Sequence, residues 1–100
     1  MALTEPHLSA AEIAALVARG DASVGARDIA SARLFYQRAV EAGDDGAALR
    51  MGATFDPAFL NRANIRGASG NQQEAISWYR RARELGEAKA ERQFKKLPTQ

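Results

Sequence analysis

Cysteine is absent from the 100-residue sequence, and histidine occurs once, as His7. Without cysteine the chain forms no disulfide and has no thiolate for catalysis or metal binding. His7 has neither a second histidine nor a cysteine to act with, so we expect no metal site and no catalytic dyad around it. The sequence therefore gives no support to an enzyme, and no cofactor is expected.

Long apolar segments are absent as well. No stretch approaches the roughly 20 apolar residues that a membrane-spanning helix needs. Residues 1–10 include Glu5, Pro6 and His7 and lack the apolar centre of a signal peptide. We therefore expect a soluble chain with the cytoplasm as its favoured compartment. A fragment of a larger, envelope-associated protein is the alternative that the sequence leaves open.

Proline is scarce, with three in the chain, and alanine makes up much of the 46% hydrophobic fraction. Alanine favours helices but contributes little buried area per residue, so an alanine-rich core suits helices that approach each other closely. A chain of this length forms one domain with a shallow core. We predict a single all-α domain.

Charge is distributed unevenly along the chain, which carries a net charge of +2. Residues 1–61 hold five basic and eight acidic side chains, a balance of −3, whereas residues 62–100 hold nine and four, a balance of +5. The second half would suit an acidic partner. A solvated helix face with scattered arginines is the more ordinary explanation, because protein surfaces commonly mix both signs.

An internal repeat relates residues 28–43 to residues 71–86 with a constant offset of 43. Seven of the sixteen aligned positions are identical or both aromatic, which is hard to obtain by chance. The pairs are Ala32 and Ala75, Phe35 and Trp78, Tyr36 and Tyr79, Arg38 and Arg81, Ala39 and Ala82, Glu41 and Glu84, and Gly43 and Gly86. Apolar and small residues recur at helical spacing, so each copy predicts one amphipathic helix.

The ends of these two helices are marked by the residues that flank them. Asp28 and Asn71 are good N-cap residues, whose side-chain oxygens accept hydrogen bonds from the free amides of the first turn. Gly43 and Gly86 stand where a helix can end in a left-handed residue, a conformation that glycine adopts most readily. We predict that the two helices end at these glycines.

A further helix precedes each copy. A capping box starting at Ser9 opens the first, and Asp44 or Asp45 caps the other. Gly20 and Gly52 hold equivalent places inside these preceding helices. Glycine within a helix costs up to about 1 kcal/mol relative to alanine, so both glycines indicate close packing against the helix that follows.

The second unit contains an eleven-residue insertion at 56–66 that the first unit lacks. Asp56 followed by Pro57 is typical of a helix start, with aspartate as the cap and proline at the first helical position. We predict a short extra helix from Pro57 to about Asn64. A final helix at 87–97 is expected to cap the chain.

The run Ala-x-x-Trp-Tyr-x-Arg-Ala-x-x-x-Gly at 75–86, with its degenerate copy at 32–43, resembles the Sel-one-like repeat (SLR). That family is a branch of the tetratricopeptide-like (TPR-like) superfamily of helix-turn-helix repeats. The stretch 49–55, which includes Gly52, is similar to the Leu-Gly-x-x-Tyr element of the family's first helix, with Phe55 in the tyrosine place.

The resemblance covers about residues 11–89 and implies an all-α, right-handed superhelical stack of two helix-turn-helix repeats. Within one domain of residues 1–100, repeat one spans about 10–43 and repeat two about 44–86, with an extra short helix in the second repeat and a C-terminal capping helix. The first unit departs from the family at 19–23, where the leading motif is missing. The structural signature comprises Ala32, Tyr36, Ala39, Gly43, Ala75, Trp78, Tyr79, Ala82 and Gly86.

The resemblance also implies a scaffold role without enzymatic activity, in which the first helices of the repeats line a concave groove. Arginine and asparagine suit an acidic or extended peptide, because they bond to carboxylates and backbone groups. The polar residues in or beside these helices are our candidates for partner contact: Arg19, Arg50, Asn61, Arg62, Asn64 and Arg66.

The sequence thus favours a non-catalytic adaptor that binds a protein or peptide segment, and its alanine-heavy, arginine-over-lysine usage favours a bacterial source. Two alternatives remain open. The basic stretch from Arg80 to Lys96 would suit nucleic acid, although the repeat alone explains Trp78 and makes this alternative the weaker one. Exposed ends of the stack would allow a homo-oligomer, since two units are fewer than the about three that usually stabilise a solenoid.

Overall fold

The computed structural model describes residues 7–95, with side chains as far as residue 88. These residues form five helices and no strand, so the all-α prediction is confirmed. The helices are α1 (Ala10–Gly25), α2 (Ile29–Glu41), α3 (Asp45–Phe55), α4 (Pro57–Arg62) and α5 (Gln72–Lys95). Within this part of the chain, none of them combines the length and the apolar character needed to cross a membrane.

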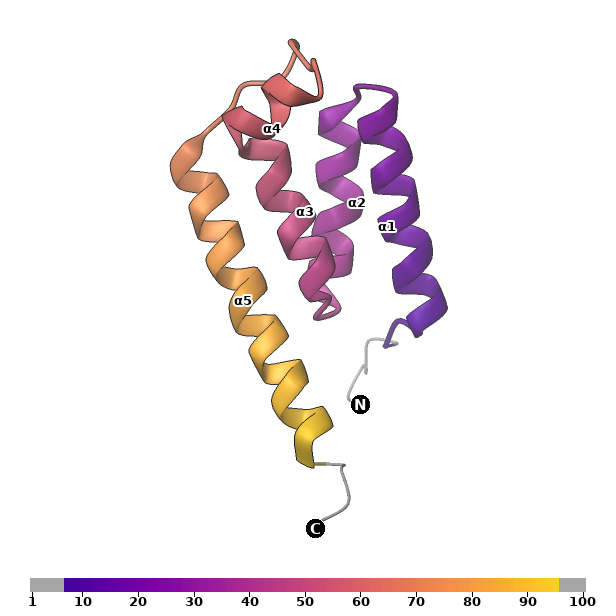
Figure 1. The fold of residues 1–100 in the computed structure, drawn as a ribbon. Coiled ribbons are helices and arrows are strands. Elements are labelled where there is room, and N and C mark those ends of the chain that lie inside the picture. The colour runs from indigo at the N-terminus through magenta and orange to yellow at the C-terminus, as the bar shows by residue number, and fades with distance from the viewer. Residues whose placement is uncertain (1–6, 96–100) are drawn as a thin grey trace, which may run out of the picture.

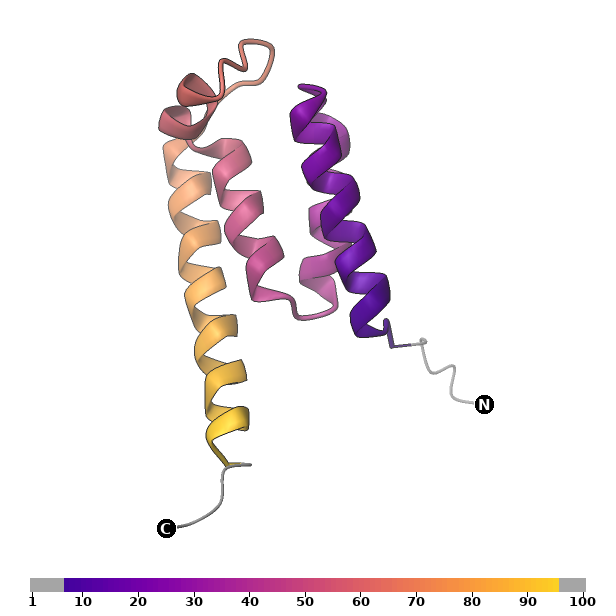
Figure 2. The same cartoon turned by 45° about the vertical axis from the view of Figure 1, so that its right-hand side comes forward.

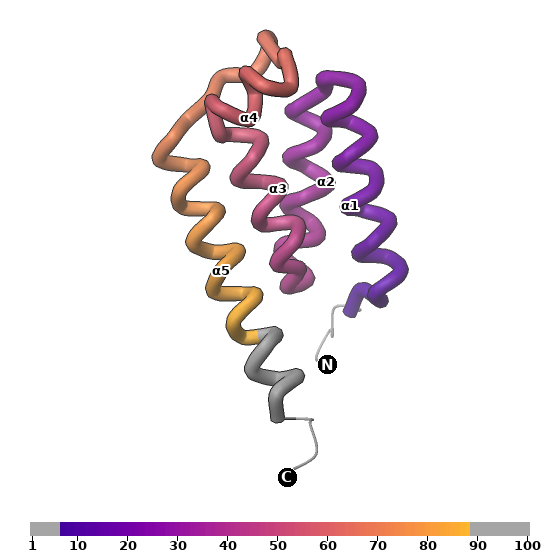
Figure 3. The backbone as a smooth tube through the Cα atoms, viewed as in Figure 1, coloured from indigo at the N-terminus to yellow at the C-terminus, as the bar shows by residue number. Residues whose placement is uncertain are grey.

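The helices pack in the order in which the chain makes them. α1 lies against α2, α2 against α3, and α3 against α5, and these four helices alternate in direction (Figure 1). The short α4 packs across the end of α3 before the chain turns into α5 (Figure 3). A second view shows α1 and α5 at opposite edges of the molecule (Figure 2). The two inner helices, α2 and α3, are therefore covered on two sides.

Each helix begins at the polar residue that the sequence predicts. The side-chain oxygen of each accepts a hydrogen bond of 2.8–3.1 Å from a backbone amide of the first turn. The capping residues are Ser9, Asp28, Asp44, Asp56 and Asn71. The capping box is complete, since Ser9 N also donates to Glu12 Oε1 at 2.8 Å. Of the two candidates for α3, Asp44 is the cap.

Three of the helices are followed, two positions after their last residue, by a residue in the left-handed conformation, and only one of these residues is glycine. Gly43 follows α2 with φ 92°, as predicted, whereas Arg27 (φ 62°) follows α1 and Asn64 (φ 57°) follows α4. In each case the next amide donates to the carbonyl five residues back, at 2.8–3.1 Å, and satisfies a free carbonyl of the last turn. The predicted short helix after Asp56 is confirmed, with its last residue at Arg62.

The prediction that a helix ends at Gly86 and a separate helix follows at 87–97 is wrong. α5 continues through Gly86 as one helix as far as Lys95. Gly43 is followed at once by Asp44, which caps the next helix, whereas Gly86 is followed by glutamate, alanine and lysine, all good helix formers. Nothing in the local sequence therefore stops the helix at this glycine.

Gly86 allows a close approach instead of a turn. A Cβ at this position would lie 3.2 Å from a carboxylate oxygen of Asp45, at the start of α3. Glycine here lets α5 pass near the α3 N-terminus without displacing that side chain. The part of the predicted final helix beyond Lys95, including Leu97, lies outside the described residues.

Two glycine–tyrosine contacts join the helices in pairs, α1 with α2 and α3 with α5. A Cβ at Gly20 would overlap the ring of Tyr36, and a Cβ at Gly52 would overlap the ring of Tyr79. Both predicted close approaches are confirmed. Each tyrosine hydroxyl donates to an aspartate of the same pair or its adjoining cap: Tyr36 to Asp21 Oδ1 at 2.5 Å, and Tyr79 to Asp56 Oδ2 at 2.8 Å.

Candidate binding groove

A groove separates α1 from α3, because both helices pack against α2. It consists of two clefts, of about 560 Å³ and about 260 Å³, which meet at Asp21. The larger cleft lies between the first half of α1 and the turn from α2 to α3. The smaller continues toward α4, with Tyr36 of α2 and Phe59 of α4 among its lining residues.

Apolar and small side chains of α1 form one wall of the larger cleft. Ile13 and Val17 are half-buried, and the alanines beside them, Ala14 and Ala18, are exposed. Ile13 and Val17 also pack against the buried residues of α2 and α3, so each has one side on the core and another toward the groove. The alanines leave room for a ligand, since they fill little of the space between the helices.

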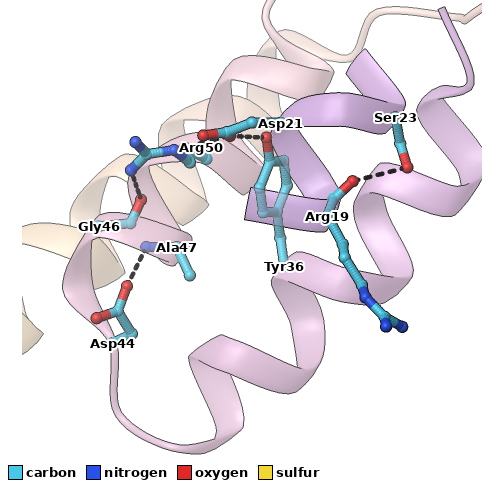
Figure 4. A network of polar contacts seen from close by, with 8 residues as sticks. All are labelled: Arg19, Asp21, Ser23, Tyr36, Asp44, Gly46, Ala47 and Arg50. Atoms are coloured by element: carbon cyan, nitrogen blue, oxygen red, sulfur yellow. Dashed lines mark hydrogen bonds and ion pairs between the residues drawn. The ribbon is translucent and has the colours of Figure 1, made fainter. Parts of the chain in front are cut away.

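A polar cluster lies where the two clefts meet (Figure 4). Arg50 Nε of α3 lies 3.0 Å from Asp21 Oδ1 of α1, and the Tyr36 hydroxyl donates to the same oxygen. Arg50 Nη1 also donates to the carbonyl of Gly46 at 3.4 Å. The Asp21 and Arg50 side chains are 48% and 44% exposed, so a ligand can reach both charged groups. The cluster thus links three helices while remaining open to the groove.

The hydroxyl of Tyr36 stays protonated in this cluster. Burial raises the pKa of Tyr36 above its ordinary value of 10.0, and the hydrogen bond to Asp21 raises it further, whereas Arg50 acts in the opposite direction. A neutral hydroxyl that donates to a carboxylate fixes the side chain of Asp21 in place. The tyrosine therefore positions Asp21.

Of the six predicted contact residues, Arg50 alone lies in this groove. Arg19 of α1 has its guanidinium 6.0 Å from the ring centroid of Phe35, and it points away from Asp21 and Arg50 (Figure 4). The four others are exposed and lie on α4 or the loop after it: Asn61, Arg62, Asn64 and Arg66. The structure does not bring the six residues together.

Two of these four residues, Asn64 and Arg66, form hydrogen bonds within the protein itself. The Asn64 carbonyl accepts a hydrogen bond from Arg27 Nε at 3.4 Å, and its side-chain Oδ1 accepts one from Arg66 Nε at 3.3 Å. Asn64 thus connects the end of α4 to the turn after α1. Sequence reasoning missed Asp21 in the groove, because only the fold brings it beside Arg50, 29 residues away.

The signature residue Trp78 packs against the core. It packs against two buried clusters, one formed by α2 and α3 and the other by α2, α3 and Ala82 of α5, and its Nε1 donates to Glu74 at 3.2 Å. The Arg81 guanidinium lies 5.4 Å from the centroid of the Trp78 ring. These contacts support the structural interpretation of Trp78 over a role in stacking on nucleic acid bases.

No metal-binding constellation is found in the described part of the chain, where no three histidine, cysteine or acidic side chains lie close enough to hold an ion. Comparison with protein-family models, curated proteins and solved structures finds no significant match to the chain.

Proposed function

We propose that this chain is a non-catalytic protein-interaction domain that binds a segment of a partner protein in the groove between α1 and α3. The observation that carries the proposal is the groove itself. α1 and α3 both pack against α2 and leave open space between them. An apolar groove with a few well-placed polar groups is typical of sites for extended or helical segments.

The lining of the groove indicates the chemistry of that segment. Ile13 and Val17 offer apolar contacts, and Asp21 and Arg50 offer a carboxylate and a guanidinium to the backbone or to a polar side chain. Asp44 and Asp45 add two further carboxylates to the lining of the larger cleft. We therefore propose a segment that carries apolar side chains. Three carboxylates beside one guanidinium do not support a preference for an acidic segment.

We also propose that α1–α2 and α3–α5 are two repeats of a Sel-one-like, TPR-like unit, stacked as a right-handed superhelix. Support comes from the two glycine–tyrosine contacts, which join the helices of each pair at residues that the sequence repeat aligns. In a stack of this kind the leading helices, here α1 and α3, face the ligand. The position of the groove agrees with that arrangement.

A peptide selection tests the binding proposal. Random peptides displayed on phage are selected on the wild-type chain, and the enriched peptide is titrated while backbone amide shifts are followed by NMR. We expect the shifts to cluster around Val17, Asp21 and Arg50. Ala14→Arg places a long charged side chain in the groove and should weaken binding at least about tenfold, a change of roughly 1.4 kcal/mol.

Ala11→Arg is the matched control, because Ala11 is exposed on the same helix but does not line the groove. It should bind the peptide like the wild type. If Ala14→Arg and Ala11→Arg bind equally well, or if the shifts map to α4 or α5, then the groove is not the binding site.

A further inference from the structure

The outer side of α5 carries a cleft of its own, of about 310 Å³, lined by Ile76, Tyr79, Arg80 and Arg83. Ile76 is 47% exposed, and Tyr79 is only half-buried although it belongs to the repeat signature. α3 packs along the other side of α5. This outer surface, called the α5 face below, is unusual in exposing an isoleucine and a tyrosine side by side.

The repeat offset of 43 aligns the α5 face with a surface of α2 that is covered. The aligned residues of α2 are Arg33, Tyr36, Gln37 and Val40. Tyr36 and Val40 are each 2% exposed and cluster with residues of α3, Tyr36 with Met51 and Val40 with Ala47 and Ala48.

The first residue of that α2 surface also binds α3 directly. Arg33 donates to the hydroxyl of Thr54 at 3.2 Å and to its carbonyl at 2.7 Å. Its guanidinium lies 3.8 Å from the centroid of the Phe55 ring. The same surface of the unit is thus covered by a following helix in the first pair and bare in the second. The molecule itself therefore shows what kind of element covers this face: a leading helix like α3.

The other leading helix of the chain, α1, leaves the matching surface bare. Aligning Gly20 with Gly52 places Ala15 on Ala47, Arg19 on Met51 and Ala22 on Thr54. The three residues of α3 are at most 3% exposed and face the interior, whereas the three residues of α1 are exposed. This surface of α1 is called the α1 face below. α2 covers the matching surface of α3, but no described helix covers the α1 face.

We infer that the α1 face of one copy of this chain docks on the α5 face of another. The two faces lie on helices at opposite edges of the molecule (Figure 2), so each copy can engage a neighbour at both ends. Such a head-to-tail interface is heterologous, and it propagates rather than closing into a symmetric dimer. The contact repeats the packing of α3 on α2 and is separate from the groove between α1 and α3.

Charge and ring contacts favour this pairing. In the docked position Arg19 replaces Met51, which places its guanidinium over the ring of Tyr79. Glu12 lies on the α1 face one turn before Ala15, and it approaches Arg83 of the α5 face. Exposed pairs of this kind are weakened by salt, so the association should decrease as ionic strength rises.

Sedimentation and light scattering of the purified chain test the inference. The wild-type mass should rise with concentration and pass that of a dimer. Ile76→Glu disrupts the α5 face and Ala15→Arg disrupts the α1 face; each variant alone should be monomeric, with association at least about tenfold weaker. Both residues are exposed in the single chain, so circular dichroism should show unchanged helix content.

Mixing the two variants provides the decisive measurement. Ile76→Glu retains an intact α1 face and Ala15→Arg an intact α5 face, so an equimolar mixture should form a dimer and stop there. Leu34→Glu, on an exposed residue of α2 outside both faces, should associate like the wild type. A monomeric wild type at every concentration, a mixture that stays monomeric, or association that only Ile76→Glu abolishes would each overturn the head-to-tail contact.

Discussion

Tyr36 and Tyr79 occupy the same position in the two helix pairs, yet their surroundings differ. Tyr36 is 2% exposed, whereas Tyr79 is half-buried. Burial is the main cause of the raised pKa in both, and for Tyr79 the pKa rises to about 12. The ring of each lies on a glycine of the first helix of its pair, Gly20 of α1 or Gly52 of α3, and each hydroxyl donates to an aspartate.

The comparison separates two contributions to the core. Contacts within a pair, such as a ring on a glycine, are the same in both units and follow from the repeated sequence. The depth of burial depends on the next helix, because α2 lies between α1 and α3, whereas α3 is the one helix that packs extensively on the described part of α5. The signature tyrosine is therefore fully buried in the first pair, where another helix follows, and only half-buried in the second, whereas the small Ala75 and Ala82 are buried where α5 packs against α3.

The largest expected effect comes from truncating the two rings. Tyr36→Ala should lower the free energy of unfolding by about 3–5 kcal/mol, because a large buried side chain is lost and a cavity remains. Tyr79→Ala should cost about 1–2 kcal/mol, since part of its ring already contacts water. Urea denaturation followed by circular dichroism at low protein concentration measures both.

Equal losses for the two variants would contradict the comparison, because they would mean that Tyr79 is as well packed as Tyr36. Tyr36→Phe and Tyr79→Phe serve as controls. They keep the ring and remove only the hydrogen bond to aspartate, so each should cost about 0.5–1.5 kcal/mol.

A second test concerns the glycine under the ring of Tyr36. Gly20→Ala should destabilise the chain by about 1–3 kcal/mol, because the added methyl group overlaps the tyrosine and the two helices must separate. Gly25→Ala in the same helix should stabilise it by about 0.5–1 kcal/mol, since no atom lies within 4 Å of the added Cβ and alanine favours the helix. Thermal melts of both variants give the comparison. If both substitutions are stabilising, the close approach of α1 and α2 at this point is incorrect.

The local signals in the sequence predicted the local structure well. Ser9, Asp28 and Asn71 cap helices because a side-chain oxygen reaches an amide only three residues ahead, and that geometry depends on no other part of the fold. The prediction at Gly86 failed because glycine permits a helix end without requiring one. Its role is set by Asp45, which is distant in sequence and adjacent in space.

The groove was harder to predict for the same reason. Asp21, Tyr36 and Arg50 are 15 and 29 residues apart along the chain, and only the packing of three helices unites them. The candidates Asn61 and Arg62 were chosen for polarity and position beside the leading helices. α4 carries them to the end of the molecule, away from that cluster, because it crosses the end of α3.

The smallest expected effect concerns the two turns that precede α2 and α3. Both have an alanine, a left-handed residue and a capping aspartate, but the left-handed residue is Arg27 in one turn and Gly43 in the other. A side chain in this conformation costs about 1–2 kcal/mol relative to glycine. Arg27→Gly removes that strain, although it also increases the entropy of the unfolded chain, so the net gain should be about 0.5 kcal/mol. Gly43→Ala should lose about 1 kcal/mol.

Arg27→Asn separates strain from chain entropy. Asparagine tolerates the left-handed region, as Asn64 shows at the end of α4, and it does not loosen the unfolded chain as glycine does. Arg27 also donates to the Asn64 carbonyl at 3.4 Å, a long and exposed bond whose loss should cost little. We therefore expect Arg27→Asn to match or exceed the gain of Arg27→Gly in urea denaturation. A loss of stability in both variants would show that the hydrogen bond from Arg27 to the Asn64 carbonyl outweighs the backbone strain at Arg27. The turn between α1 and α2 would then be stabilised by the segment at 56–66 rather than by its own residues.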